Sequence, residues 1–299
     1  MGKLKNHTID NSQNQCYYYN NFNFGVIFIK KLFILLFLPF ALLSCACGLN
    51  ENLSDSSKQT GSTESKPIES KTENTTSINP TETVTRKNIK INFLGDSITA
   101  GVGASAKSKC YVNQIGLKVD TVRNYGIGST SIAYQIKSSV PGRYFCNRYQ
   151  EMDNDADYIV IFGGTNDYGF GDAPLGKPDD ATPETFYGSL NYLYSAIMNN
   201  YPDSKIIVVT PMHMLGDDNL QGYNGYKGKD VATLETYVNI IKQVAGTYSL
   251  PVIDLYSVSE LNPNNPELKN TYFADGVHPN DSGHKLISEI ILNFINSVE

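Results

Sequence analysis

The chain has 299 residues, 40% of them hydrophobic and 18% charged, so it is long enough for one large globular domain or two small ones. Its formal net charge is −6. Without residues 1–44, which hold four lysines and one aspartate, 20 basic and 29 acidic residues remain, a net charge of −9. This acidic balance argues against nucleic acid as a partner, because binding phosphates needs a basic face.

Residues 1–44 predict an N-terminal extension followed by an export signal. Residues 30–44 hold two lysines and then 13 uncharged residues, too few to span a bilayer, which needs about 20. The stretch Leu42-Leu-Ser-Cys45 resembles a bacterial lipobox, which implies that Cys45 is the lipid-bearing first residue of the mature chain. Ordinary cleavage near Ala46, or a core helix, is the alternative. We therefore expect a membrane-anchored lipoprotein at the cell surface or in the periplasm.

Residues 45–87 have the composition of a disordered tether. From Ser54 to Thr85, 15 of the 32 residues are Ser or Thr, mixed with Glu, Lys and Asn. Such a stretch buries too little apolar surface to offset the entropy lost on ordering. The chain therefore divides into residues 1–44, this tether, and a folded domain over residues 88–299.

Five cysteines occur, at positions 16, 45, 47, 110 and 146. Their spacing fits no zinc-binding pattern, and the sequence has no glycine-rich phosphate-binding motif, so neither a metal nor a cofactor is expected. If the domain is exported, Cys110 and Cys146 can form a disulfide. The alternative is that both are buried thiols.

From residue 88 onward, short apolar runs that predict strands alternate with longer stretches that predict helices. The expected strands are residues 89–94, 120–124, 158–163, 205–210 and 251–255, and the expected helices are residues 107–117, 184–200, 230–248 and 282–297. Strands separated by helices imply parallel pairing with right-handed crossovers. The predicted fold is a flavodoxin-like, three-layer α/β/α sandwich of about five parallel strands.

Three polar blocks follow predicted strands or precede a predicted helix, the positions at which α/β folds usually have their catalytic residues. Gly95-Asp96-Ser97 ends the first predicted strand, Gly164-Thr165-Asn166-Asp167 follows the third, and Asp275-Gly276-Val277-His278 precedes the last helix. Ligands bind at the carboxyl edge of such sheets. A serine there can be a nucleophile, although it can equally be a helix N-cap. The order Ser, Asp, His is the one found in α/β-hydrolases, but geometry and not order identifies a triad.

In this order, the three blocks resemble the SGNH, or GDSL, hydrolase family over roughly residues 88–299. The resemblance implies the same three-layer fold and a serine esterase. It implies that Ser97 attacks a carbonyl, that His278 is the base, and that Asp275 orients His278 and stabilises the imidazolium.

The resemblance also implies an oxyanion hole with three donors: the backbone N–H of Ser97, a backbone N–H in a second block, and the side chain of Asn166. The second block corresponds to residues 124–130, where the family's glycine falls on Ser129 and Gly128 stands one position earlier. Which of the two donates is left open. Asp96 is expected to hold the loop and not to act as the triad acid.

Two further histidines are candidates for other roles. His213 follows the fourth predicted strand, so it lies at the same sheet edge and is the alternative base. His284 falls inside the last predicted helix and is expected to cap or pack. Asp281 or Ser282 is expected to cap that helix.

We expect a carbohydrate or other small-molecule ester with a short acyl group as the substrate. The loops at residues 168–183 and 211–229 are rich in Gly, Tyr and Asp, and no long apolar lid is evident. A lipid esterase, lysophospholipase or thioesterase is the alternative among enzymes. A catalytically inactive glycan-binding module on the same fold is the alternative from another class.

Overall fold

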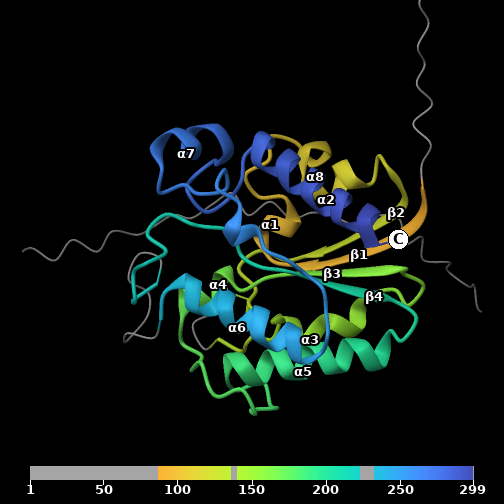
Figure 1. Cartoon of the computed structure of the whole chain (residues 1–299), viewed down its shortest axis with the longest axis vertical. Helices are drawn as coiled ribbons and strands as arrows, with labels where there is room; N and C mark the ends of the chain where they lie inside the picture. The colour runs from red at the N-terminus through yellow and green to blue at the C-terminus, as the bar shows by residue number, and fades with distance from the viewer. Residues whose placement is uncertain (1–86, 136–139, 223–231, 299) are drawn as a thin grey trace, which may run out of the picture. The chain divides into compact units, whose positions relative to one another are not determined.

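The computed structural model describes residues 87–135, 140–222 and 232–298, which form a parallel sheet between two layers of helices (Figure 1). The strands are β1 (Lys87–Gly95), β2 (Val119–Gly126), β3 (Tyr158–Phe162), β4 (Lys205–Val209) and β5 (Val252–Ile253). Their order across the sheet is β2-β1-β3-β4-β5, and every neighbouring pair is parallel. This is the flavodoxin-like order, which reverses between β1 and β3.

The central strands are buried on both faces, and their side chains alternate between two apolar cores. In β3, Tyr158, Val160 and Phe162 belong to one core, whereas Ile159 and Ile161 belong to the other. All five residues are at most 3% exposed. Because helices cover both faces, the strand reads as a continuous apolar run instead of an alternating one.

The helices lie in two layers, one on each face of the sheet (Figure 1). Their bounds are α1 (Ser97–Ala100), α2 (Tyr111–Ile115), α3 (Phe145–Arg148), α4 (Thr165–Phe170), α5 (Phe186–Asn200), α6 (Leu234–Thr247), α7 (Pro266–Tyr272) and α8 (Asp281–Val298). Short 3₁₀ turns are η1 (Lys107–Lys109), η2 (Tyr149–Glu151) and η4 (Leu255–Ser257). Helices α3, α4, α5 and α6 pack on one face, and α2 and α8 on the other.

The predicted architecture is confirmed, with differences in several elements. All five expected strands form, but β5 spans only Val252–Ile253 and is shorter than expected. The prediction of a continuous helix over residues 107–117 was wrong, because Cys110 takes an extended ψ of 139° and separates η1 from α2. Helix α7 had no counterpart among the expected elements. It begins at Pro266 with Asn265 as its cap.

The cap of the last helix differs from the expected one. The side-chain Oδ1 of Asn280 accepts hydrogen bonds from the N–H groups of Ser282 (2.9 Å) and Gly283 (3.1 Å). Asp281 instead accepts hydrogen bonds from the backbone N–H and the hydroxyl of Ser105 (2.7 and 2.6 Å). Asp281 therefore ties α8 to the segment that follows α1.

Cys110 and Cys146 are both buried, and no disulfide joins them. The expected signal segment, the lipid-bearing Cys45 and residues 45–86 of the tether lie outside the described residues. Lys87, expected as the last residue of the tether, is instead the first residue of β1. None of the helices within residues 87–298 that the structure describes has the length and apolar character needed to cross a membrane.

Candidate active site

The carboxyl ends of β1 and β3 meet where the strand order reverses, which is the place where open α/β sheets bind ligands. At the end of β1 the chain turns back tightly over the sheet. A Cβ built on Gly95 would lie 1.9 Å from Thr99 Oγ1 and 3.0 Å from the Phe162 carbonyl oxygen. Only glycine fits there, so Gly95 allows α1 to begin directly above the strand.

Ser97 is the first residue of α1, and Asp96 caps that helix. The Asp96 carboxylate accepts a hydrogen bond from the Ile98 N–H (2.9 Å) and is 1% exposed. Burial raises the pKa of Asp96 to about 6, although that hydrogen bond and the nearby positive charges oppose the increase. Asp96 therefore fixes the turn that presents Ser97.

His278 lies between Ser97 and Asp275. The distance from Ser97 Oγ to His278 Nε2 is 2.9 Å, and the distance from His278 Nδ1 to Asp275 Oδ2 is 2.8 Å. Between Asp275 and His278, Gly276 has a φ of 97°, which suits glycine and closes the turn. The structure thus brings together three side chains that stand up to 181 positions apart in the sequence.

The Asp275 carboxylate is held in its charged form. Partial burial would raise its pKa, but hydrogen bonds from the His278 ring and from the N–H groups of His278 and Val277 outweigh burial and lower the pKa to about 2. A carboxylate only accepts hydrogen bonds, so His278 Nδ1 carries the proton. The lone pair of Nε2 then faces the hydroxyl of Ser97.

The loop after β2, residues 127–135, passes close to Ser97. A Cβ built on Gly128 would lie 3.9 Å from the Cβ of Ser97. Ser129 has a φ of 61°, a left-handed conformation that few non-glycine residues adopt. Neither the Gly128 nor the Ser129 N–H donates to another group among the described residues, so both are available to a ligand.

Asn166 and Asp167, at the start of α4, hold the same loop. The Asn166 side-chain amide donates to the Thr130 carbonyl (2.7 Å), which uses one of its two N–H bonds. The Asp167 carboxylate accepts the N–H groups of Ile132 (2.9 Å) and Ala133 (2.8 Å). Burial raises the pKa of Asp167 to about 7. The structure therefore fixes the orientation of Asn166 toward the loop that borders Ser97.

Arg148 is a site residue that no sequence motif marks. Its buried guanidinium donates to the carbonyls of Gly95 (2.7 Å), Tyr125 (2.6 Å) and Arg143 (2.9 Å) and to the Thr130 hydroxyl (3.1 Å). Burial lowers its pKa to about 10, so it stays charged at neutral pH. Most of its acceptors are backbone carbonyls, which every residue type provides. The sequence therefore does not indicate that Arg148 connects these segments, and only the folded chain shows it.

The two other histidines of the domain have different partners. His284 is fully buried, stacks on Tyr111 and lies 3.1 Å through Nε2 from the Val102 carbonyl oxygen, so it packs as expected. His213 lies in the β4 loop, which we define as residues 210–217, and its Nδ1 is 2.6 Å from Asp217 Oδ2. The residue that reaches Ser97 is therefore His278.

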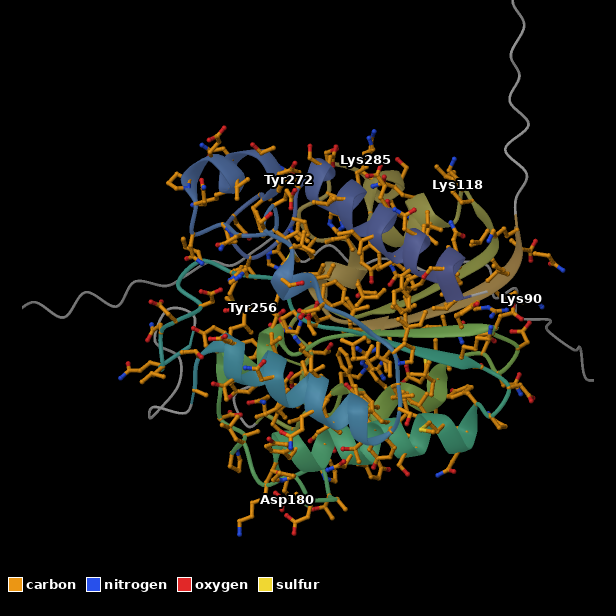
Figure 2. The ribbon with its side chains drawn as sticks, in the orientation of Figure 1. Lys90, Lys118, Asp180, Tyr256, Tyr272 and Lys285 are labelled. Atoms are coloured by element: carbon orange, nitrogen blue, oxygen red, sulfur yellow. The ribbon has the colours of Figure 1, made fainter. Side chains whose placement is uncertain are left out.

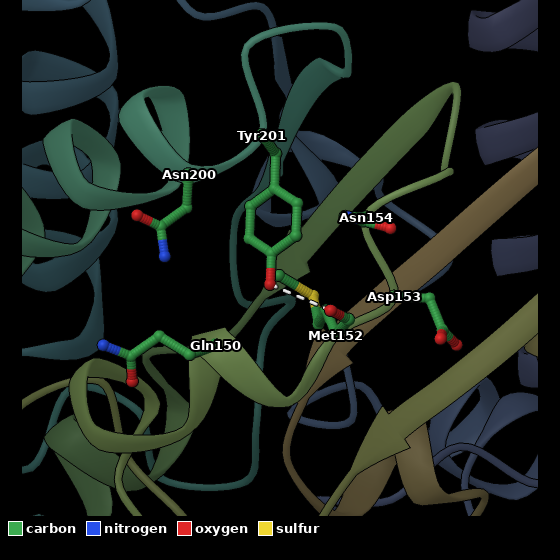
Figure 3. Close-up of a pocket in the computed structure, with 6 residues that line it drawn as sticks. All are labelled: Gln150, Met152, Asp153, Asn154, Asn200 and Tyr201. Atoms are coloured by element: carbon green, nitrogen blue, oxygen red, sulfur yellow. Dashed lines mark hydrogen bonds between the residues drawn. The ribbon is translucent and has the colours of Figure 1, made fainter.

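A shallow polar pocket of about 350 Å³ lies at the other edge of the sheet (Figure 3). It is lined by Gln150, Met152, Asp153, Asn154, Asn200 and Tyr201, which precede β3 and β4 in the chain. Because the strands are parallel, this pocket is remote from Ser97. Within residues 87–135, 140–222 and 232–298, no group of three His, Cys, Asp or Glu side chains is arranged to hold a metal ion.

The model of the GDSL-like lipase/acylhydrolase family matches residues 93–286 of the chain, a range that contains Ser97, Asn166 and His278. The chain belongs to this family. As a GDSL-like acylhydrolase, it is a carboxylic ester hydrolase. No curated protein matches the sequence.

Solved structures share the fold of this acylhydrolase. A protein of Lactobacillus plantarum is 29% identical with a TM-score of 0.61, and the match covers 71% of this chain and 98% of that one. A possible lipase of Chitinophaga pinensis is 24% identical with a TM-score of 0.54, over 71% of this chain and 99% of that one. A two-domain esterase active on acetylated mannans is 20% identical with a TM-score of 0.50, over 72% of this chain and 50% of that one.

Proposed function

We propose that the protein is a serine esterase in which Ser97, His278 and Asp275 form the catalytic triad. The observation that carries the proposal is the continuous contact from Ser97 Oγ through His278 to Asp275, at 2.9 and 2.8 Å. A serine hydroxyl becomes an effective nucleophile when an adjacent base takes its proton. The charged Asp275 carboxylate, with its pKa lowered to about 2, stabilises the imidazolium that results.

The reaction proceeds in two steps. Ser97 Oγ attacks the ester carbonyl carbon while His278 Nε2 takes the hydroxyl proton. His278 then gives that proton to the leaving alcohol, and an acyl-serine ester remains. A water molecule, deprotonated by His278, attacks this ester and releases the carboxylic acid, and the proton returns to Ser97.

Both steps place negative charge on the former carbonyl oxygen, which needs preorganised donors. We assign this role to the N–H of Ser97, the second N–H of Asn166, and an N–H of Gly128 or Ser129. The N–H groups of Gly128 and Ser129, which have no acceptor among the described residues, support this assignment. The left-handed backbone of Ser129 supports it too, because strain of this kind concentrates at functional sites.

We propose acetyl or similarly short acyl groups on carbohydrates as the substrate. The Gly128 loop passes so near Ser97 that a Cβ built on Gly128 would be in van der Waals contact with the Ser97 Cβ (3.9 Å), which favours a small acyl group. Polar and aromatic side chains, among them His213, Asp217 and Tyr256, gather where β4 and β5 end, and such groups suit a hydroxylated alcohol.

An acyl-chain series tests this substrate class. We expect kcat/KM to be highest for acetyl esters and to fall by about 10-fold or more at octanoyl, because a small acyl site excludes added methylenes. The measurement is initial hydrolysis rates of aryl esters and of acetylated sugars by the purified protein. A maximum at octanoyl would support a lipid esterase instead, and no turnover of any ester would support a binding module.

We also propose that the domain is tethered to a membrane outside the cytoplasm by a lipid on Cys45. The lysine pair, the short apolar run and the lipobox-like Leu42-Leu-Ser-Cys45 support this. Cys45→Ser should move the protein from the membrane fraction to the soluble fraction, because diacylation anchors stably and its loss removes the anchor. Mass spectrometry of a mature N-terminus at Ala46 or later, without lipid, would contradict the proposal.

A further inference from the structure

The β4 loop is fixed beside both of the loops that carry the proposed catalytic groups. At one end, Pro211 packs against Gly164, where an added Cβ would lie 3.0 Å from Pro211 Cγ. At the other end, the Leu215 N–H donates to the Gly276 carbonyl (2.8 Å). His213 stands midway between these anchors. It is therefore held at the edge of the sheet between the turn of Asn166 and the turn of His278.

The His213 ring is held rigidly in one orientation. Its Nδ1 lies 2.6 Å from Asp217 Oδ2, and the Asn264 amide donates to Asp217 Oδ1 (3.2 Å). The ring stacks on Tyr256 with centroids 3.8 Å apart. Figure 2 places Tyr256 toward the α1 end of the sheet, with Lys90 toward the opposite end. A side chain that is held at one ring nitrogen and over one ring face loses little entropy when a ligand binds.

The remaining nitrogen of His213 is available to a ligand. A carboxylate at Nδ1 makes Nδ1 the proton-bearing nitrogen, so in the neutral ring Nε2 presents a lone pair. Among the residues that the structure describes, no group hydrogen-bonds to Nε2, and the side chain is 21% exposed. The ring is thus a rigid acceptor at the edge of the proposed active site, and none of the described residues occupies it.

We infer that His213 is a specificity residue that accepts a hydrogen bond, through Nε2, from a hydroxyl on the alcohol part of the ester. The inference rests on the proposed esterase function and adds the group that this site selects. A second hydroxyl on the alcohol part can donate to His213 Nε2. An alkyl or aryl alcohol part without a second hydroxyl would leave Nε2 without a donor. His213 takes no part in the chemistry at Ser97, because His278 already occupies that hydroxyl.

The test compares three esters with the same acyl group and three forms of the enzyme: the wild type, His213→Ala and His213→Gln. The substrates are a glucose monoacetate and the corresponding deoxy sugar that lacks the hydroxyl beside the ester, with an aryl acetate as the reference. For the wild type, loss of that hydroxyl should lower kcat/KM by about 10-fold, mainly through KM, as removal of one hydrogen bond predicts. His213→Ala should lower kcat/KM for the glucose monoacetate by a similar factor.

The decisive result is that the loss of the substrate hydroxyl and the loss of the His213 ring do not have additive effects on kcat/KM. His213→Ala should hydrolyse the two sugar acetates at nearly equal rates, and its kcat/KM for the aryl acetate should stay within about twofold of wild type. His213→Gln keeps an acceptor oxygen and should retain part of the discrimination, which also provides a second variant if His213→Ala unfolds. Thermal unfolding of each variant confirms that the fold is kept.

The possible failures are distinguishable. If the wild type hydrolyses neither aryl acetate nor sugar acetate, the proposed esterase function itself is wrong. If the wild type hydrolyses all three esters but folded His213 variants discriminate between the two sugars as the wild type does, only the His213 inference is overturned. Equal loss of all three activities in a folded His213 variant would overturn it too, because that result would assign His213 to the chemistry.

Discussion

Ser97→Ala should lower kcat for acetyl ester hydrolysis by about 10⁴-fold or more and leave the fold intact. The hydroxyl is the only group that the change removes, and in the structure it contacts His278 Nε2 at 2.9 Å. Without it no acyl-enzyme can form. The remaining activity would come from binding and from the oxyanion donors alone.

Steady-state kinetics with an aryl acetate would measure this loss, and a serine-reactive phosphonate should label Ser97 in the wild type only. Ser105→Ala is a matched control. The Ser105 hydroxyl donates to Asp281, the first residue of α8, and not to a histidine. It should keep near-normal kcat. Normal turnover by Ser97→Ala would end the serine-esterase proposal.

Asn166→Ala should lower kcat by less than Ser97→Ala does. Loss of one oxyanion donor typically costs about 10²–10³ in kcat with little change in KM, since the bond strengthens in the transition state. A large rise in KM at unchanged kcat would make Asn166 a ground-state binding residue.

His278→Ala should abolish turnover to nearly the level of Ser97→Ala. Both changes remove parts of one proton-transfer unit, so the double variant should be hardly slower than either single one. Circular dichroism and thermal unfolding would check the fold, and kcat of the three variants would be compared with His213→Ala, which keeps the base. Turnover by His278→Ala together with loss in His213→Ala would reverse the assignment of the base.

The same assignment predicts that kcat/KM rises with pH on the acid side, because neutral imidazole is the active form of His278. Asp275, with its pKa lowered to about 2, stays charged throughout that rise. Burial raises the pKa of Asp96 to about 6 and that of Asp167 to about 7. These two carboxyls ionise at a higher pH in the folded than in the unfolded chain. Their contribution to stability therefore falls as pH rises from the ordinary aspartate pKa of 3.8 to their raised values of about 6 and about 7.

The contribution of these two carboxyls to stability therefore runs opposite to the predicted rate gain, whereas the contribution of buried His284, whose pKa is lowered, runs in the same direction. Asp96→Asn keeps the side-chain oxygen that caps α1 and removes one of the two buried carboxyls that ionise in this range. It should preserve the acid limb of the pH profile. Disappearance of that limb in a folded Asp96→Asn variant would assign it to Asp96 instead of His278.

Strands and catalytic candidates were predictable for the same physical reason. A strand that is covered on both faces, such as β3, must be continuously apolar. A polar residue just after such a strand is therefore easy to recognise, and in a parallel sheet it lies at the edge that binds ligands. Ser97 after β1 and Asn166 after β3 are the examples here. Caps and breaks were less predictable. Asn280, Asp281 and Ser282 all suit the N-cap position, and only the path of the chain selects Asn280.

Residues that act through the backbone could not be predicted. Arg148 bonds three carbonyls from separate segments, and Asp167 bonds two amides of residues 132 and 133. Any residue type provides those backbone groups, so no pattern in the sequence indicates the contact. The sequence does place His213 at this edge of the sheet, because it follows a predicted strand. It does not indicate the bond of the Leu215 N–H to the Gly276 carbonyl, which fixes the loop of His213.

Because one guanidinium, that of Arg148, bonds several segments at the carboxyl edge of the sheet, these segments should open together in local unfolding. Its bonds reach the end of β1, the end of β2 and the loop at Thr130, so local opening of any one segment strips partners from a buried cation. A buried charge without partners is costly, which favours opening of all three segments together over opening of one. Amide hydrogen exchange around Gly95, Tyr125 and Thr130 should therefore follow one shared opening equilibrium.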